Sequence, residues 1–232
     1  YWSFIMALPK LNETPKYSLT VPSTGKELRY RPYLVKEEKI LLMASSSEDP
    51  KQIMNAVHDT IAACVENIDI RSLTTFDLEY IFIQLRSKST GETSEILIKC
   101  PKCESQQKVT IPLNEIAVTE TNVNPVIKIS DNVTVVMKYP SYQDIPSDTD
   151  DVGFTLIATS IKEVIHGDEK VDIDDEPIEA VIAFLESMTH DQFQLIAKFF
   201  EDAPSVKYDL ELVCQSCGEI SDIEIKGMQS FF

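Results

Sequence analysis

The sequence predicts an α+β fold in which a split, zinc-ribbon-like β unit carries a helical N-terminal region and a mainly helical, acidic insertion. Two Cys-x-x-Cys pairs predict the β unit, because each pair lies between segments in which apolar residues alternate with a period of two. Apolar residues at helical spacing predict the helical parts. The 232 residues are enough to bury a sizeable core.

The first folded segment is expected to be a β-hairpin over residues 16–33, because two extended segments flank the turn-forming tetrapeptide Pro-Ser-Thr-Gly at 22–25. Helices should follow. Asp49 can cap a helix that has Pro50 in its first turn. Cys64 then lies on the apolar stripe of that helix, which favours core packing over a reactive thiol.

A further helix is predicted over residues 75–88 by a capping box, in which Thr74 is the cap and Asp77 its partner. Two strands should come next. The segments Glu-Ile-Leu-Ile-Lys-Cys and Lys-Val-Thr-Ile-Pro-Leu flank the first cysteine pair, as two strands joined by a tight metal-binding turn would require.

The insertion should open with a short β pair, because two extended segments flank a turn signal at residues 130–132. The polar stretch at 140–151 has no hydrophobic period and is interpreted as a linker. Residues 166–175 are expected to form a short hairpin or a loop. Between them, one helix is predicted from an apolar stripe of Phe154, Ile157, Ala158, Ile161 and Ile165.

Two more helices are predicted in the insertion. The first follows Pro177 at a first-turn position, and the second opens with a capping box of Thr189 and Gln192. Residues 144–202 carry 16 Asp or Glu and three Lys, and so supply most of the formal net charge of −17. We interpret this segment as a solvated acidic face that keeps the protein soluble. The carboxylates of residues 166–175 do not match an EF-hand loop, so calcium binding is not expected there.

The β pattern returns near the end of the chain, where apolar residues alternate before and after the second cysteine pair. Zinc favours four ligands in a tetrahedron, and each Cys-x-x-Cys turn supplies two thiolates. Pro101 and Gly218 suit the sharp bends of such turns. The sequence therefore predicts a closed, structural zinc site with no open position for water, formed by Cys100, Cys103, Cys214 and Cys217.

The spacing of the pairs is unusual, because 110 residues lie between Cys103 and Cys214, whereas two-pair sites are usually separated by about 15–20 residues. We therefore predict that residues 112–205 are inserted between two hairpins of one ribbon. Residues 6–111 would hold the N-terminal hairpin, the helices and the first half of the ribbon, and residues 206–232 the second half and an apolar tail. Residues 1–5 are interpreted as a remnant upstream of the natural start.

Other chemistry finds little support in the sequence. A thioredoxin-like redox pair should lie where a strand enters a helix, whereas both pairs lie inside β patterns; separate or vacant pairs are a further alternative. There is no Gly-rich phosphate loop, HExxH motif or nucleophile elbow, and the three histidines are scattered. We expect no enzymatic activity. No apolar run reaches the roughly 18 residues that a membrane span needs.

The chain resembles the baseplate hub and hub-assembly proteins of contractile-tailed bacteriophages of the T-even type. The resemblance rests on the block MALPKLNETPKYSLTVPSTGKELRYRPYLVKEEKILLMA at 6–44, the pair CPKC, the late CQSCG and the ending IEIKGMQSFF. It implies a non-enzymatic protein, made in the cytoplasm of the host bacterium, that forms part of the hub in the virion tail or acts as a chaperone of its assembly. Its partners would be other baseplate and hub proteins, and the hub would impose threefold symmetry.

The apolar tail of Met228, Phe231 and Phe232 is expected either to dock into a partner or to pack on its own domain. The rival interpretation of the chain is a zinc-ribbon regulator that binds nucleic acid or a polymerase. The net charge of −17 and the lack of a basic, aromatic β face count against nucleic-acid binding.

Overall fold

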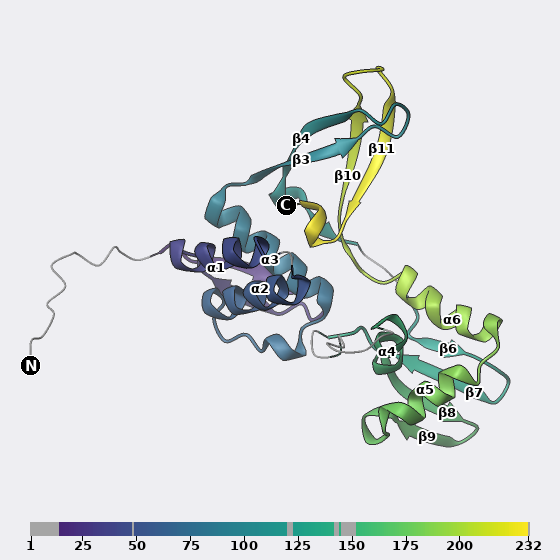
Figure 1. Ribbon diagram of the computed structural model, residues 1–232. Coiled ribbons are helices and arrows are strands. Elements are labelled where there is room, and N and C mark those ends of the chain that lie inside the picture. The colour runs from purple at the N-terminus through teal and green to yellow at the C-terminus, as the bar shows by residue number, and fades with distance from the viewer. Residues whose placement is uncertain (1–13, 48, 120–122, 142–143, 145–151, 232) are drawn as a thin grey trace, which may run out of the picture.

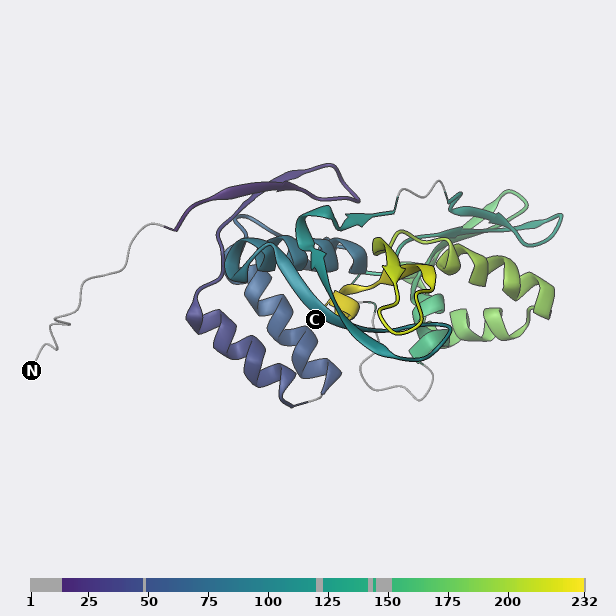
Figure 2. The same ribbon diagram turned by 90° about the horizontal axis from the view of Figure 1, so that it is seen from above.

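The computed structural model describes residues 14–47, 49–119, 123–141, 144 and 152–231. The predicted remnant at 1–5, most of the predicted linker at 140–151, and Phe232 lie outside the described residues. The described chain forms three parts: an N-terminal body, a β unit that projects from it, and an acidic module (Figure 1). Figure 2 shows the N-terminal body and the acidic module at opposite ends of the molecule.

The N-terminal body consists of one hairpin and three α-helices, of which the hairpin and the last two helices match predicted segments and the first helix was not assigned from the sequence. The helices are held at their starts by side chains. The Asp49 carboxylate accepts a hydrogen bond of 2.9 Å from the Lys51 N–H at the start of the second helix, and the capping box of Thr74 and Asp77 opens the third. The elements are β1 (Tyr17–Thr20), β2 (Glu27–Tyr30), α1 (Val35–Ser45), α2 (Pro50–Cys64), the short helix η1 (Ile70–Ser72) and α3 (Thr75–Thr90).

Asp77 also fastens the β1–β2 hairpin to α3. Its carboxylate is fully buried and accepts hydrogen bonds from the Ser23 N–H at 2.9 Å and the Ser23 hydroxyl at 2.6 Å. It accepts two further bonds from the N–H and hydroxyl of Thr74. Because a buried carboxylate is costly unless it is hydrogen-bonded, these four bonds are what makes the buried position tenable.

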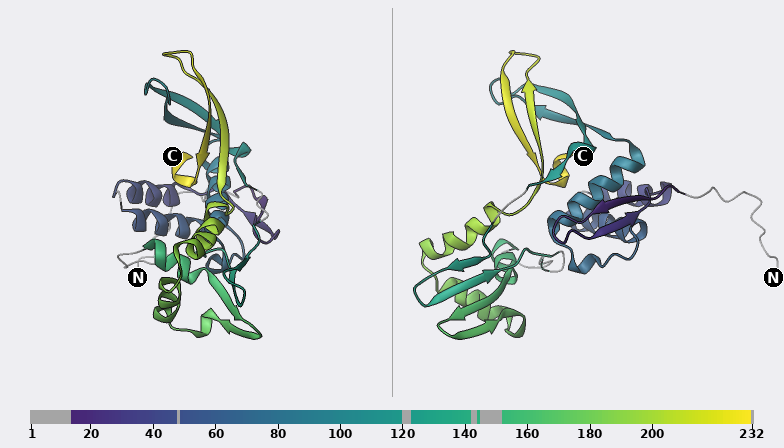
Figure 3. Two further views of the ribbon diagram at one scale, coloured as in Figure 1. Left: turned by 90° about the vertical axis from the view of Figure 1, so that its right-hand side faces the viewer. Right: turned by 180° about the vertical axis from the view of Figure 1, so that it is seen from behind.

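The β unit consists of two antiparallel hairpins that come from distant parts of the sequence. β3 (Thr93–Lys99) pairs with β4 (Gln106–Pro112), and β10 (Val206–Val213) pairs with β11 (Ile220–Lys226). Figure 3 shows the two hairpins side by side, with their turns at the end that points away from the rest of the molecule. The short segments η2 (Leu113–Glu115), β5 (Ala117–Val118) and η5 (Met228–Phe231) lie at the base of the unit, where β5 pairs with β10.

The acidic module, defined here as residues 123–202, contains a four-stranded antiparallel sheet in the order β6-β7-β8-β9 together with three α-helices. The β6–β7 pair and the last two helices match the predicted elements, whereas the predicted hairpin or loop at 166–175 contains only the turn and the second strand of the observed β8–β9 hairpin. The elements are β6 (Val126–Lys128), β7 (Val133–Met137), α4 (Val152–Thr159), β8 (Ile161–His166), β9 (Glu169–Asp172), the short helix η4 (Ile173–Asp175), α5 (Ile178–Glu186) and α6 (His190–Glu201).

One predicted helix of the module is wrong in its second half. Ile161 and Ile165 were assigned to the same helix as Phe154, but α4 ends at Thr159 and both isoleucines lie in β8. The buried Ser160 marks the change, since its N–H and hydroxyl both donate to the Leu156 carbonyl while its own carbonyl accepts from the Lys138 N–H at 2.7 Å. β8 pairs with β7 and β9, and these two ladders outweigh the helical spacing.

Two hydrophobic cores hold the chain together. The first joins the N-terminal body to the base of the β unit and contains Cys64, 2% exposed, as predicted. The second lies inside the acidic module. An aromatic contact links the two parts: the Tyr139 ring stacks on Phe199 at 5.1 Å between centroids and meets the edge of Phe76 at 5.5 Å.

Candidate metal centre

The four predicted ligands meet at the far end of the β unit. Their Sγ atoms all lie within 4.8 Å of one another. Two of these contacts cross between the hairpins, with Cys100 Sγ 3.8 Å from Cys217 Sγ and Cys103 Sγ 3.6 Å from Cys214 Sγ. A tetrahedral ion with metal–sulfur bonds of about 2.3 Å sets its sulfurs about 3.8 Å apart, whereas a disulfide would bring them to about 2.05 Å. The spacing fits one metal ion bound by all four thiolates.

The two cysteine turns have the same backbone structure. In the first, the Cys100 N–H donates to the Ser105 carbonyl at 2.9 Å and the Glu104 N–H donates back to the Cys100 carbonyl at 2.9 Å. In the second, the same two bonds join Cys214 to Glu219 at 2.8 Å and Gly218 to Cys214 at 2.9 Å. Each turn therefore presents its two sulfurs in the same way.

The residue after each pair has a left-handed backbone. Glu104 has φ 58° and Gly218 has φ 72°. Glycine adopts this conformation without strain, whereas a side chain costs about 1–2 kcal/mol. The sequence indicates this bend at Gly218 but gives no sign of it at Glu104, which occupies the equivalent position in the first turn.

Two polar contacts hold the hairpins together beside the sulfurs. The Gln107 side chain of β4 donates from Nε2 to the Val213 carbonyl at 3.0 Å and accepts at Oε1 from the Gln215 N–H at 2.9 Å. Lys102 of the first turn forms an ion pair with Glu219 of the second. The ion pair is exposed and contributes little by itself, but Gln107 fixes the register of one hairpin against the other.

Ser105 is a site residue that sequence reasoning missed. Its hydroxyl lies 3.1 Å from Cys103 Sγ and 3.4 Å from Cys214 Sγ. The pKa of the Cys214 thiol is lowered to about 5, chiefly by the Ser105 hydroxyl and further by the backbone N–H groups of Cys217 and Ser216. The Ser105 hydroxyl is also the largest cause of the lowered pKa of Cys103. A serine two residues after a cysteine is too common to have pointed to this role.

Four thiolates in so small a space also repel one another. Backbone hydrogen bonding by Glu219 favours the Cys217 thiolate, but partial loss of hydration within the cluster and the three neighbouring sulfurs outweigh it and raise the pKa of Cys217 to about 12. A divalent cation would remove this conflict, because a metal ion stabilises all four thiolates together. Only Cys100 and Cys214 are buried, and the outer two sulfurs are exposed, so an ion could enter from the tip.

Of the predicted tail residues, Met228 and Phe231 belong to the short helix η5 at the base of the β unit. Met228 is 4% exposed and belongs to the first core. Phe231 ends η5, and Phe232 lies outside the described residues. Met228 therefore packs on its own domain, and the partner contact of the two phenylalanines stays a prediction.

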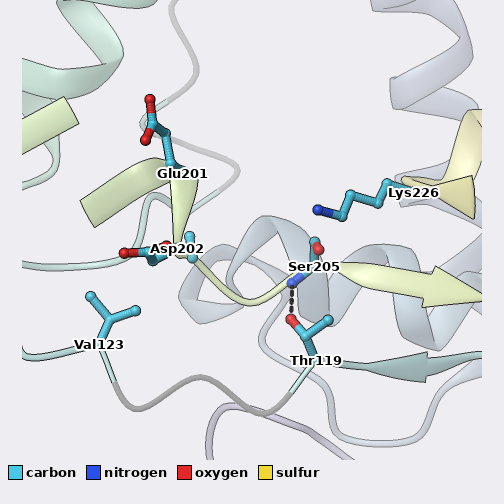
Figure 4. Close-up of a pocket in the computed structure, with 7 residues that line it drawn as sticks. Thr119, Val123, Glu201, Asp202, Ser205 and Lys226 are labelled. Carbon is cyan, nitrogen blue, oxygen red and sulfur yellow. Dashed lines mark hydrogen bonds between the residues drawn. The ribbon is translucent and has the colours of Figure 1, made fainter. Parts of the chain in front are cut away.

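A cavity of about 400 Å³ lies where the chain passes between the β unit and the acidic module. Figure 4 shows the Ser205 N–H donating to the Thr119 hydroxyl at this neck, a bond of 3.0 Å. The Lys226 ammonium reaches toward the neck, whereas the side chains of Glu201 and Asp202 point elsewhere. The residues drawn therefore do not form an acid and base pair aimed at a common point.

Comparison with known proteins assigns the chain to a protein family. The sequence profile described as T4 bacteriophage base plate protein matches residues 14–232. The chain belongs to this family. The match to the baseplate protein family extends across both cysteine pairs and the acidic module, and it indicates no enzyme family. No curated protein and no solved structure matches the chain. Within the described residues, no helix is both long and apolar enough to cross a membrane.

Proposed function

We propose that this baseplate protein is a non-enzymatic component of the central hub of the phage tail baseplate, or a protein that assembles the hub. The observation that carries the proposal is the family match over residues 14–232. The resemblance of the N-terminal block at 6–44 to hub and hub-assembly proteins adds the hub to that family assignment. The protein would act through contacts with other baseplate proteins in the host cytoplasm and the virion tail, with threefold symmetry where it enters the hub.

The metal in this proposal is Zn²⁺, bound by Cys100, Cys103, Cys214 and Cys217. Four sulfur ligands at tetrahedral spacing suit zinc, and four protein ligands leave no position for water or substrate. The ion would therefore have a structural role. It would hold together two hairpins whose cysteine pairs are separated by 110 residues of sequence. In this way it would fix the shape of a projecting β unit that is available to a partner.

The C-terminal pair Phe231 and Phe232 is the proposed contact with a hub partner. Because Met228 belongs to the first core, the test removes only the last two residues. The shortened chain should keep its metal and its melting temperature but lose incorporation into baseplates. A fall in stability instead would mean that the two phenylalanines pack on their own domain.

The hub role is tested by quantitative mass spectrometry of purified virions, with copies of this chain counted against known tail proteins. A few copies per particle, cross-linked to hub proteins, would support a hub component. Abundance in infected-cell lysate and absence from virions would support an assembly chaperone. Cross-links confined to peripheral baseplate proteins would overturn both, and measurable affinity for DNA or RNA at low salt would revive the regulator.

A further inference from the structure

Helix α1 presents apolar side chains to solvent. Val35 is 79% exposed, Leu42 is 63% and Met43 is 65%. Their spacing of i, i+7 and i+8 places them on one side of the helix, opposite the buried Glu37 and Ala44. Such a face is typical of a helix that binds an apolar groove through a few anchor side chains.

A groove of that kind lies on the acidic module. A cavity of about 300 Å³ opens between β8, β9 and α5, and its lining is mostly apolar. Val171, at 41% exposure, lies on the solvent side of this groove. The lining includes Val164, Val171, Ile173, Val181 and Phe184.

The two surfaces have opposite charge. Residues 168–179, which border the groove, carry seven Asp or Glu and one Lys. α1 itself carries two Lys and two Glu. Glu37 is buried and paired with Arg31, and Glu38 is half-buried. Lys36 and Lys39, in contrast, are exposed, and Lys39 falls between Val35 and Leu42 on the apolar face. An apolar helix bordered by lysines thus matches an apolar groove bordered by carboxylates.

The two surfaces cannot meet within one chain. Figure 1 and the right-hand view of Figure 3 both place α1 at one end of the molecule, and α5 with β9 at the other. Between two chains they can meet, because each chain would offer its helix to one neighbour and its groove to another. This contact is head-to-tail, and repetition of it builds a ring or an open chain.

We propose that α1 docks into the groove bordered by β8, β9 and α5 on a second copy of the chain. Leu42 and Met43 would fill the groove, and Lys36 and Lys39 would face the carboxylates of residues 168–179. The proposal stands apart from the hub role, since it concerns how copies of the chain meet wherever they act. It predicts self-association that weakens as salt screens the charges.

The test is sedimentation velocity of the full-length protein over a range of concentrations at low and high salt. Wild-type protein should form dimers and larger species that diminish at high salt. Leu42→Glu removes the helix surface and Val171→Lys removes the groove, so each variant alone should remain monomeric. Leu195→Glu is the matched control, because Leu195 is 46% exposed on α6 outside both surfaces, and it should behave as wild type.

Mixing the two variants tests whether the contact is head-to-tail, with the helix of one chain in the groove of another. An equimolar mixture of Leu42→Glu and Val171→Lys retains one intact helix and one intact groove, so it should form a dimer and nothing larger. The proposal is overturned if wild-type protein stays monomeric, if Val171→Lys associates as wild type does, or if the mixture stays monomeric. Circular dichroism and metal content confirm folding, and Lys39→Glu replaces Leu42→Glu should that variant misfold.

Discussion

Cys103 Sγ and Cys214 Sγ lie 3.6 Å apart although 110 residues separate them in the chain. Closing so long a loop costs only about 0.6 kcal/mol more per doubling of its length. The two ends of this loop are also joined at the neck. There the Thr119 N–H donates to the Ser205 carbonyl at 2.9 Å, and the Ser205 N–H donates to the Thr119 hydroxyl at 3.0 Å. The acidic module has its own core and is joined to the β unit at this neck, while the four cysteines meet at the far end of the β unit.

Replacing Cys214 with Ser should release the metal and destabilise the β unit. A ligand held at about 1,000 times its dissociation constant contributes about 4 kcal/mol, so the variant should lose several kcal/mol of unfolding free energy. Metal content and chemical denaturation measure the two effects. Cys64→Ala is the control, since Cys64 lies in the first core away from the cluster: it should lose stability and keep its metal. Equal metal content in both variants would contradict the shared site.

Replacing Ser105 with Ala should weaken metal binding without unfolding the chain. The hydroxyl supports Cys103 and Cys214 from 3.1 and 3.4 Å, and loss of such supporting groups typically costs about 10–100-fold in affinity. Competition with a chelator at neutral pH measures the change. Ser216→Ala, on the exposed surface of the second turn, should leave affinity unchanged; a similar loss there would mean that the Ser105 hydroxyl has no specific role.

Replacing Asp77 with Ala should cost about 3 kcal/mol of unfolding free energy or more. The change removes a buried acceptor of four hydrogen bonds and leaves the N–H groups of Ser23 and Thr74 without it. Ser23→Ala deletes one hydroxyl and keeps the N–H bond, so about 1 kcal/mol is expected. Chemical denaturation compares the two. If they lose the same amount, Asp77 does not fasten the hairpin to α3.

Glu79 should make the stability of the folded protein depend on pH. Burial on α3 raises the pKa of Glu79, and the Met228 N–H offsets this only in part. Because the pKa of Glu79 is higher in the folded state than in the unfolded state, protonation of Glu79 stabilises the fold. This contribution is fully present below the unfolded-state pKa, near 4.5, and is lost as the pH rises through the folded-state pKa. Glu79→Gln should therefore be more stable than wild type at pH 7, with a smaller difference at lower pH.

Exposed Glu66 should show the opposite effect of pH on stability, because its pKa is lowered rather than raised. Its hydrogen bond to Lys16 lowers the pKa of Glu66, so Glu66→Gln should slightly reduce stability at pH 7. Thermal melts of both variants against wild type at two pH values test the pair. A Glu79→Gln variant that is less stable than wild type at pH 7 would refute the assignment.

The sequence predicts those elements whose local signals agree with their tertiary setting. The Asp49 cap, the Thr74–Asp77 and Thr189–Gln192 capping boxes and the alternation beside both cysteine pairs all mark real helix starts and strands. Helix α1 was not assigned from the sequence, because apolar residues lie at both its exposed and its buried positions and obscure the helical period.

Errors arise where one segment fits two periods. Ile157 and Ala158 share helical spacing with Ile161, while Ile161 and Ile165 also fit a strand. Pairing with β7 and β9 decides between the two, and such distant partners are not visible locally. The clustering of the four cysteines could be predicted from the two Cys-x-x-Cys pairs and the strands beside them, whereas Ser105 and Gln107 act across hairpins and carry no local signal.

The most direct test of the shared metal centre is native mass spectrometry of protein purified without chelators, combined with thiol alkylation. A shared site should yield one zinc ion per chain, with the four clustered thiols protected until a chelator removes the metal. Removal should also open the β unit and leave the acidic module folded. A metal-free chain whose four thiols react at once, and whose two hairpins nevertheless stay together, would contradict the shared site.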